Sequence, residues 1–80
     1  MSLEKIRDII EQHGRLQAGV ENLTNDSDLY AAGLTSLATV GLMLALEDEF
    51  DIEFPENMLS RKTFESIDAI SEAVEDIKAK

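Results

Sequence analysis

Ser36 stands in the stretch GLTSL, residues 33–37, and carries the hydroxyl whose surroundings most invite a chemical role. A serine hydroxyl becomes a strong nucleophile when an adjacent base takes its proton. The chain has one histidine, His13, and no G-x-S-x-G sequence surrounds Ser36. A small hydrolase would need the fold to bring His13 or another base to Ser36, which nothing in the sequence favours. We therefore predict no catalytic residue, and we expect His13 at the exposed end of a helix.

The acidic stretch EDEFDIEFPE, residues 47–56, offers many carboxylates and raises the question of a metal site. It lacks the Asp-x-Asp-x-Asp-Gly order of a calcium loop, in which the glycine permits a sharp turn. In a helix, the successive carboxylates of Glu47, Asp48 and Glu49 point in different directions. We predict no metal site.

The chain is strongly acidic, with 17 acidic and 7 basic residues and a net charge of −10. No Lys or Arg occurs from Leu16 to Ser60, whereas that span holds nine acidic residues. They are Glu21, Asp26, Asp28, Glu47, Asp48, Glu49, Asp51, Glu53 and Glu56. Such a field repels nucleic acid and attracts basic protein surfaces. The charge excludes a nucleic-acid partner but leaves open a basic protein partner or a plain solvated surface.

The size and composition indicate one small domain covering residues 1–80, without cysteine and hence without disulfides or thiolate metal sites. No stretch reaches the roughly 18 consecutive apolar residues of a membrane span. The first residues, MSLEKIRDII, carry acids at helical spacing and do not resemble a secretion signal. We expect a soluble, monomeric, cytoplasmic protein with no membrane partner.

The spacing of apolar residues predicts a first helix over residues 3–13. Its apolar face consists of Leu3, Ile6, Ile9 and Ile10. Ser2 is suited to cap its start, and Gly14 to end it in a left-handed conformation. A long loop should follow over residues 15–35, held to the core by apolar anchors. These anchors are Leu16, Val20, Leu23, Leu29 and Tyr30.

The clearest helix is predicted over residues 36–50, and its apolar residues form two stripes. The first stripe consists of Leu42, Met43, Leu46 and Phe50. The second consists of Leu37, Val40 and Leu44. A helix buried on one side needs only the first stripe. The second therefore either contacts more of the domain or stays exposed for a partner or ligand.

Beyond this helix, Pro55 interrupts the helical pattern, and residues 56–59 are expected to form one short turn with Met58 and Leu59 pointing inward. Phe64 should plug the core. Ser66 caps the last helix, and Asp68 suits its first turn. Its apolar face consists of Ile67, Ile70, Val74 and Ile77. The predicted fold is all-α: a small antiparallel bundle of three main helices plus one short helix.

The run DLYAAGLTSLATVGLMLALEDEFDIEFPENML, continued by TFESIDAI, resembles the carrier-protein family, that is, acyl carrier proteins and their peptidyl relatives. In that family a serine opens the second helix within Gly-x-Asp-Ser-Leu or a similar motif, and Gly33, Ser36 and Leu37 match this frame. The stretch ALEDEFDIEFP matches the acidic end of the family's second helix and the following loop. The resemblance extends over nearly the whole chain and implies an acyl-carrier-protein-like bundle.

The resemblance implies that Ser36 carries 4′-phosphopantetheine, transferred from coenzyme A and attached through a phosphodiester. The thiol of this arm holds an acyl or aminoacyl group as a thioester. The implied partners are a phosphopantetheinyl transferase, a loading ligase and a downstream acyl-transfer enzyme. A helix N-terminus suits the attached phosphate, because its free N–H groups and its dipole favour an anion.

The chain departs from typical acyl carriers around the serine. Thr35 stands where they have Asp, although Thr can still cap the helix. Ala38 and Gly41 occupy positions that are commonly acidic in fatty-acid carriers, which argues against recognition by the standard fatty-acid enzymes. Gly41 costs up to about 1 kcal/mol relative to Ala inside a helix. It either permits close packing or leaves a smooth surface for a partner.

Two stretches, DLYAAGLTSL and FPENMLSRKTFESI, look closer to small freestanding carriers of amino acids. Such carriers are loaded by amino acid:carrier protein ligases that resemble seryl-tRNA synthetase cores; an acyl or polyketide cargo stays open. The predicted docking face comprises Thr35, Leu37, Val40, Gly41, Leu44, Glu47 and Asp48. The alternative is an unmodified acidic adaptor that binds a basic protein through the same helix.

Overall fold

A computed structural model describes residues 3–14 and 23–79 of the chain, and this part is helical throughout its regular structure. The helices are α1 (Leu3–His13), α2 (Ser36–Phe50) and α3 (Ile67–Lys78), with the short 3₁₀ helices η2 (Glu56–Met58) and η3 (Arg61–Phe64) between α2 and α3. The predicted all-α fold with three main helices is confirmed. The predicted short turn is η2, whereas η3 is an additional turn that the sequence did not indicate.

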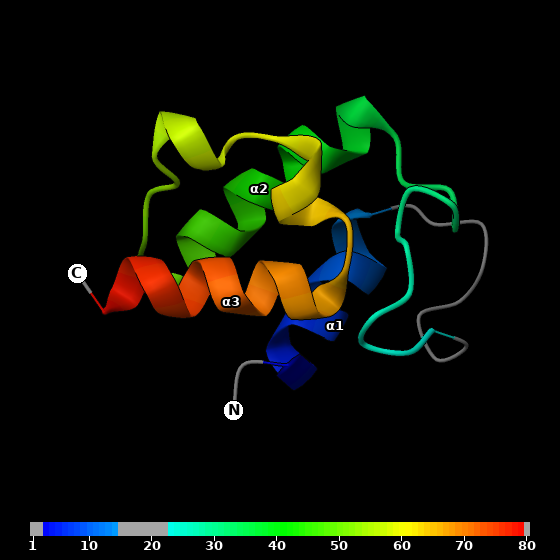
Figure 1. Cartoon of the computed structure of the whole chain (residues 1–80), viewed down its shortest axis with the longest axis horizontal. Helices are drawn as coiled ribbons and strands as arrows, with labels where there is room; N and C mark the ends of the chain where they lie inside the picture. The colour runs from blue at the N-terminus through cyan, green and yellow to red at the C-terminus, as the bar shows by residue number, and fades with distance from the viewer. Residues whose placement is uncertain (1–2, 15–22, 80) are drawn as a thin grey trace.

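The core lies where α1 packs against both α2 and α3, and η3 closes it beside α3 (Figure 1). The buried apolar side chains are Ile6, Ile9, Ile10, Leu29, Leu34, Ala38, Leu42, Leu46, Phe50, Phe54, Phe64, Ile67, Ile70, Ala73 and Val74. Each fully buried aliphatic side chain among them stabilises the fold by roughly 1.5–3 kcal/mol. The list of buried side chains confirms the predicted inward faces of α1 and α3 and the predicted burial of Phe64. Among the described residues, no helix has the length and apolar character required to cross a bilayer.

The end of α1 differs in its cause from the prediction. The helix stops at His13 as expected, and the Gly14 N–H still donates to the Ile10 carbonyl over 2.7 Å. Gly14 is not in the left-handed region; instead, a Cβ at this position would lie 2.7 Å from the Ile10 carbonyl oxygen. Glycine suits this position because the Ile10 carbonyl oxygen approaches it closely, and not because the backbone is left-handed. The predicted cap Ser2 lies outside the described residues.

The described part of the long loop is tied to the middle of α1 and to the start of α3. The Arg7 guanidinium donates to the Leu23 carbonyl and to Oδ1 of Asn25, each over 2.9 Å. The Asn25 carbonyl in turn accepts from the Asp68 N–H at the start of α3. Leu29 is fully buried, while Leu23 and Tyr30 pack partly against the core, so these three anchors are confirmed. Leu16 and Val20 lie outside the described residues.

A compact turn delivers the chain from this loop to α2. Oδ1 of Asp28 accepts the Tyr30 N–H over 2.9 Å, and the Leu34 N–H donates back to the Leu29 carbonyl over 3.0 Å. Gly33 has a φ of 117°, a conformation that side-chain-bearing residues rarely adopt. Glycine is thus required immediately before the residues that open α2.

The end of α2 confirms one expectation, and the segment after it corrects another. The helix ends at Phe50 as predicted, and its C-cap Asp51 adopts a left-handed conformation with φ 54°. Oε2 of Glu47 then accepts the Phe54 N–H over 2.9 Å and fixes the following loop. Leu59, expected to point inward, is 49% exposed, because the turn η2 directs it toward α2 at the surface. Met58 is partly buried as expected.

The start of α3 follows the sequence prediction. The Ser66 side chain accepts the Ala69 N–H over 3.0 Å and so caps the helix. Asp68 lies in the first turn, where the helix dipole favours a negative charge.

Candidate functional site

The N-terminus of α2 is capped by Thr35, not by Ser36. The Thr35 hydroxyl accepts the Ala38 N–H over 3.1 Å, and the Thr35 carbonyl accepts the Thr39 N–H over 2.9 Å and the Thr39 hydroxyl over 2.7 Å. Ser36 is the first residue of the helix and is exposed. Within the part of the chain that the structure describes, neither its hydroxyl nor its N–H nor the Leu37 N–H makes a hydrogen bond.

Replacing Thr35 by Ala should lower the free energy of unfolding by about 1 kcal/mol, because the Ala38 N–H loses its acceptor. Urea denaturation followed by circular dichroism measures this difference. Thr35→Ser keeps a hydroxyl at the cap and should retain most of the stability. Equal stability of wild type and Thr35→Ala would contradict the assigned cap.

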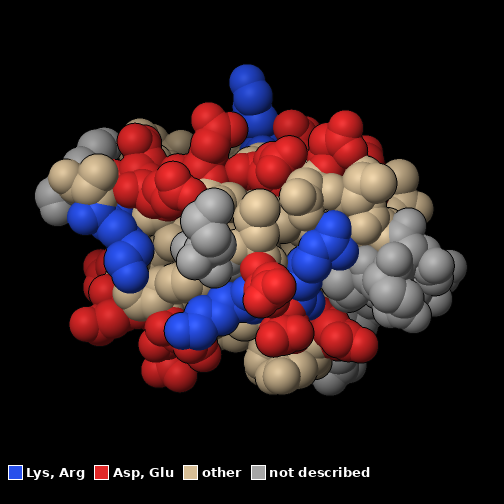
Figure 2. Space-filling model, turned by 90° about the horizontal axis from the view of Figure 1, so that it is seen from below, with Lys and Arg blue, Asp and Glu red and all other residues tan. Residues whose placement is uncertain are grey.

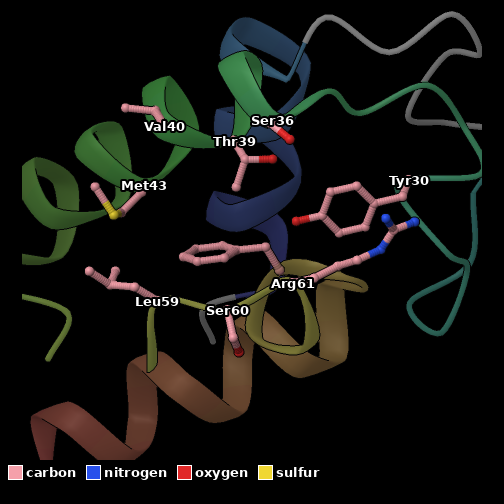
Figure 3. Close-up of a pocket in the computed structure, with 9 residues that line it drawn as sticks. Tyr30, Ser36, Thr39, Val40, Met43, Leu59, Ser60 and Arg61 are labelled. Atoms are coloured by element: carbon pink, nitrogen blue, oxygen red, sulfur yellow. The ribbon is translucent and has the colours of Figure 1, made fainter. Parts of the chain in front are cut away.

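An apolar groove of about 360 Å³ begins at Ser36 and runs along one side of α2 (Figure 3). Its lining comprises Tyr30, Ser36, Thr39, Val40, Met43, Leu59, Ser60, Arg61 and Phe64. Four of these residues belong to α2, and the others come from the turn before α2 and from the segment around η3. The hydroxyl of Ser36 therefore lies at the edge of a surface that can hold an extended, largely apolar group.

Arg61 supplies a positive charge to this groove. Its guanidinium carbon lies 4.2 Å from the centre of the Tyr30 ring, a cation–π contact that orients the exposed side chain. Figure 3 shows the Tyr30 hydroxyl pointing into the groove and the Arg61 guanidinium lying alongside the Tyr30 ring. The sequence predictions did not include Tyr30, Leu59, Ser60 or Arg61 in the site. No local pattern marks them, because only the packing of the loop and η3 against α2 brings them to Ser36.

The second apolar stripe of α2 is exposed. Leu37, Val40 and Leu44 have exposed fractions of 84%, 52% and 55%. Leu42 and Leu46 in the first stripe are fully buried, and Met43 packs partly against the core. Of the two alternatives for the second stripe, the structure shows the exposed one. An exposed apolar strip of this kind on a small protein is typical of an interaction surface.

The remaining residues of the predicted docking face differ in their exposure and in whether their side chains already form hydrogen bonds. Gly41 is exposed, and a Cβ built on it would meet nothing within 4 Å. Asp48 is exposed, but one carboxylate oxygen of Glu47 already binds the Phe54 N–H. Next to them, Glu49 forms an exposed ion pair of 3.3 Å with Lys5. Figure 2 shows Lys and Arg side chains lying among Asp and Glu side chains on the side of the molecule nearest α1.

His13 is exposed at the end of α1, as predicted, and lies in a different hollow from the Ser36 groove. That hollow is lined by Gln12, His13, Thr35, Leu37, Ala38 and Gly41. No hydrogen bond joins His13 to Ser36 among the described residues. The arrangement therefore offers an exposed hydroxyl with no base to activate it, which suits a residue that is modified by another protein's chemistry.

The elements around Ser36 fit an attached phosphate. The uncommitted N–H groups of Ser36 and Leu37 open the helix, and the helix dipole adds positive potential at this end. Arg61 lies across the same groove, in a chain whose net charge is −10. A phosphate on the hydroxyl would find donors and a cation, and a longer group beyond it would find apolar side chains.

The sequence matches a family model described as "Phosphopantetheine attachment site" over residues 4–74. It is 52% identical over 69 residues to the aminoacyl carrier protein of Agrobacterium fabrum, covering 86% of this chain and 83% of that protein. It is 31% identical over 72 residues to aminoacyl carrier protein 1 of Bradyrhizobium diazoefficiens, covering 90% of this chain and 76% of that protein.

Two solved structures resemble the fold. One is the carrier protein of Agrobacterium tumefaciens, complexed with an engineered glycine:carrier protein ligase of Bradyrhizobium japonicum and ATP. It has a TM-score of 0.93 at 48% identity and covers 96% of this chain and 100% of that chain. The other is a holo acyl carrier protein of Nitrosomonas europaea, with a TM-score of 0.86 at 29% identity, covering 100% and 99%.

Proposed function

Because the chain belongs to the phosphopantetheine-attachment family of carrier proteins, we propose that Ser36 is the residue that receives 4′-phosphopantetheine. The chain is a phosphopantetheine-dependent carrier and not itself an enzyme. The observation that carries the assignment is that the helix cap and the available hydroxyl belong to two different residues at the start of α2. Thr35 provides the cap, so the exposed Ser36 hydroxyl remains available beside free N–H groups.

Attachment consists of transfer of the arm from coenzyme A by a phosphopantetheinyl transferase. The Ser36 oxygen forms a bond to phosphorus, the pyrophosphate bond of coenzyme A breaks, and adenosine 3′,5′-bisphosphate leaves. The transferase must supply the base that takes the hydroxyl proton. The need for an external base agrees with the absence of a hydrogen-bonded base at Ser36 among the described residues. Once attached, the arm provides a thiol that holds the cargo as a thioester.

The cargo in this proposal is an amino acid rather than a fatty acid. The 52% identity to an aminoacyl carrier protein supports it. The exposed surface of α2 near Ser36 adds physical support, because the exposed Gly41 stands where fatty-acid carriers commonly have an acid. Glycine is the first amino acid to test, since the similar Agrobacterium carrier was solved with a glycine:carrier protein ligase.

The proposed partners are the transferase, an amino acid:carrier protein ligase and a downstream acyl-transfer enzyme. Their docking face is the exposed stripe Leu37, Val40 and Leu44, together with Thr35, Gly41, Glu47 and Asp48. A monomer in the cytoplasm, where coenzyme A and ATP are available, completes the proposal. The unmodified adaptor is not favoured, because the family to which the chain belongs is defined by the arm.

The test is intact-mass spectrometry in two stages. Purified protein incubated with coenzyme A and a phosphopantetheinyl transferase should gain the mass of one arm. The holo protein incubated with glycine, ATP and the B. japonicum glycine:carrier protein ligase should then gain one glycyl group, which hydroxylamine releases as expected of a thioester. Failure of several transferases to modify the folded protein would refute the carrier assignment. Modification without glycine loading would refute only glycine as cargo for this ligase.

A further inference from the structure

Resting on the carrier function proposed above, we infer that the groove beside Ser36 discriminates between cargoes by their charge. The end of the arm lies in the groove when it carries a free thiol or an uncharged acyl group. The α-ammonium group of an amino acid keeps the loaded end outside, so that loading itself releases it into solvent. Leu59 is the residue of the groove at which this selection can be reversed.

The first observation is that the two ends of the groove differ in polarity. Figure 3 shows Tyr30 and Arg61 toward the end at which Ser36 lies. Three apolar side chains line the opposite end: Val40, Met43 and Leu59. Val40 and Leu59 are about half exposed, so an apolar occupant would cover surface that water now contacts.

The attachment point determines which part of the arm meets which end. The phosphate is bonded to Ser36 and therefore stays at the end where the positive charge of Arg61 is complementary to it. The remainder of the arm is uncharged and can extend along the apolar side chains. A cargo on the terminal thiol thus reaches the apolar end, beside Met43 and Leu59.

The second observation is that nothing in the groove can pair with a cation. Of the described residues that line it, Arg61 alone carries a charge, and that charge is positive. An ammonium group that entered would lose water, find no carboxylate and experience repulsion from the guanidinium. A methyl group in the same place would instead gain from burial. The groove therefore accepts an uncharged cargo and excludes an aminoacyl cargo of the same size.

Glycyl and propionyl groups test this selection, because they match in shape and differ only in an ammonium group against a methyl group. A phosphopantetheinyl transferase attaches the arm already loaded, from glycyl- or propionyl-coenzyme A, so that no ligase is required. Cleavage of each thioester by hydroxylamine is followed by intact mass at about pH 6, below the pKa of an α-amino group. Each rate is divided by the rate for the same thioester on coenzyme A. This ratio should be about fourfold lower for propionyl than for glycyl, the effect of burying one methyl group.

The NMR signal of the Met43 methyl group gives a second readout, because Met43 lines the apolar end. The signal should shift when the arm is attached and should stay shifted in the propionyl protein. In the glycyl protein it should lie closer to its position in the protein without the arm. A Met43→Leu variant identifies the signal.

Substitution of Leu59 separates charge from polarity. Leu59→Glu places a carboxylate at the apolar end, so the glycyl thioester should become protected from hydroxylamine. Leu59→Gln has nearly the same size without the charge and should leave the glycyl ratio as in wild type. Both variants should fold, because Leu59 is 49% exposed. Circular dichroism checks this.

Equal ratios for glycyl and propionyl on wild type would overturn the inference, and so would the same response to Leu59→Glu and Leu59→Gln. In either case the protein would still carry the arm, and the carrier function would stand. Failure of the transferase to attach any arm to the folded protein would instead refute the proposed function.

Discussion

Ser36→Ala is expected to remain folded and to lose attachment of the arm completely. The loss should be total because no other atom can take the place of the serine oxygen that forms the phosphodiester. Stability should change by no more than about 0.5 kcal/mol, as is usual for an exposed side chain without specific contacts. The Ser36 hydroxyl makes no hydrogen bond among the described residues, and the helix cap resides on Thr35.

Intact-mass spectrometry after incubation with coenzyme A and the transferase measures the first effect, and urea denaturation measures the second. Thr39 and Ser60 are the other aliphatic hydroxyl residues that line the groove. An arm on the Ser36→Ala protein would have to reside on one of these or elsewhere, and peptide mapping would locate it. That outcome would refute the assignment of Ser36. An unfolded Ser36→Ala protein would refute the view that Thr35 alone supplies the cap.

The second large effect is expected from two leucines that lie close together on α2. Leu42→Ala should lower the free energy of unfolding by about 3 kcal/mol, through lost burial and the cavity left behind. Leu44→Ala should lower it by less than about 1 kcal/mol. Leu42 is fully buried and Leu44 is 55% exposed. A domain of this size is expected to have a total stability of roughly 4–12 kcal/mol, so the first change removes a large share of it.

The same pair should show the reverse order in partner binding. Leu44→Ala removes part of the proposed docking face and should weaken loading of the holo protein, measured as kcat/KM with the glycine ligase. Leu42→Ala, studied at a temperature where it stays folded, should be loaded with a kcat/KM much closer to that of wild type. Similar destabilisation by the two substitutions would contradict the burial pattern of α2. Unchanged loading of Leu44→Ala would remove Leu44 from the docking face.

The sequence by itself determined the elements whose causes are local. The span of α2, residues 36–50, follows from apolar periodicity, and the caps Thr35 and Ser66 follow from side chains that accept N–H groups three residues ahead. The inward faces of α1 and α3 were readable for the same reason. The motif of Gly33, Ser36 and Leu37, together with the acidic end of the helix and the resemblance over nearly the whole chain, directed attention to Ser36. Asp51 escaped prediction, since a left-handed Asp has no regular sequence mark.

Only the tertiary structure decided which surface of α2 remains exposed and what lies beside Ser36. The sequence left two apolar stripes on one helix, and a choice between them depends on where α1 and α3 pack, which periodicity within α2 does not contain. The groove needs Tyr30 and Arg61, which are distant from Ser36 in sequence and meet it only through the folded loop and η3. The role of Gly41 likewise depended on whether another part of the chain fills the space beside it. Local interactions fix helices and their caps, whereas exposure and cavities are properties of the assembled chain.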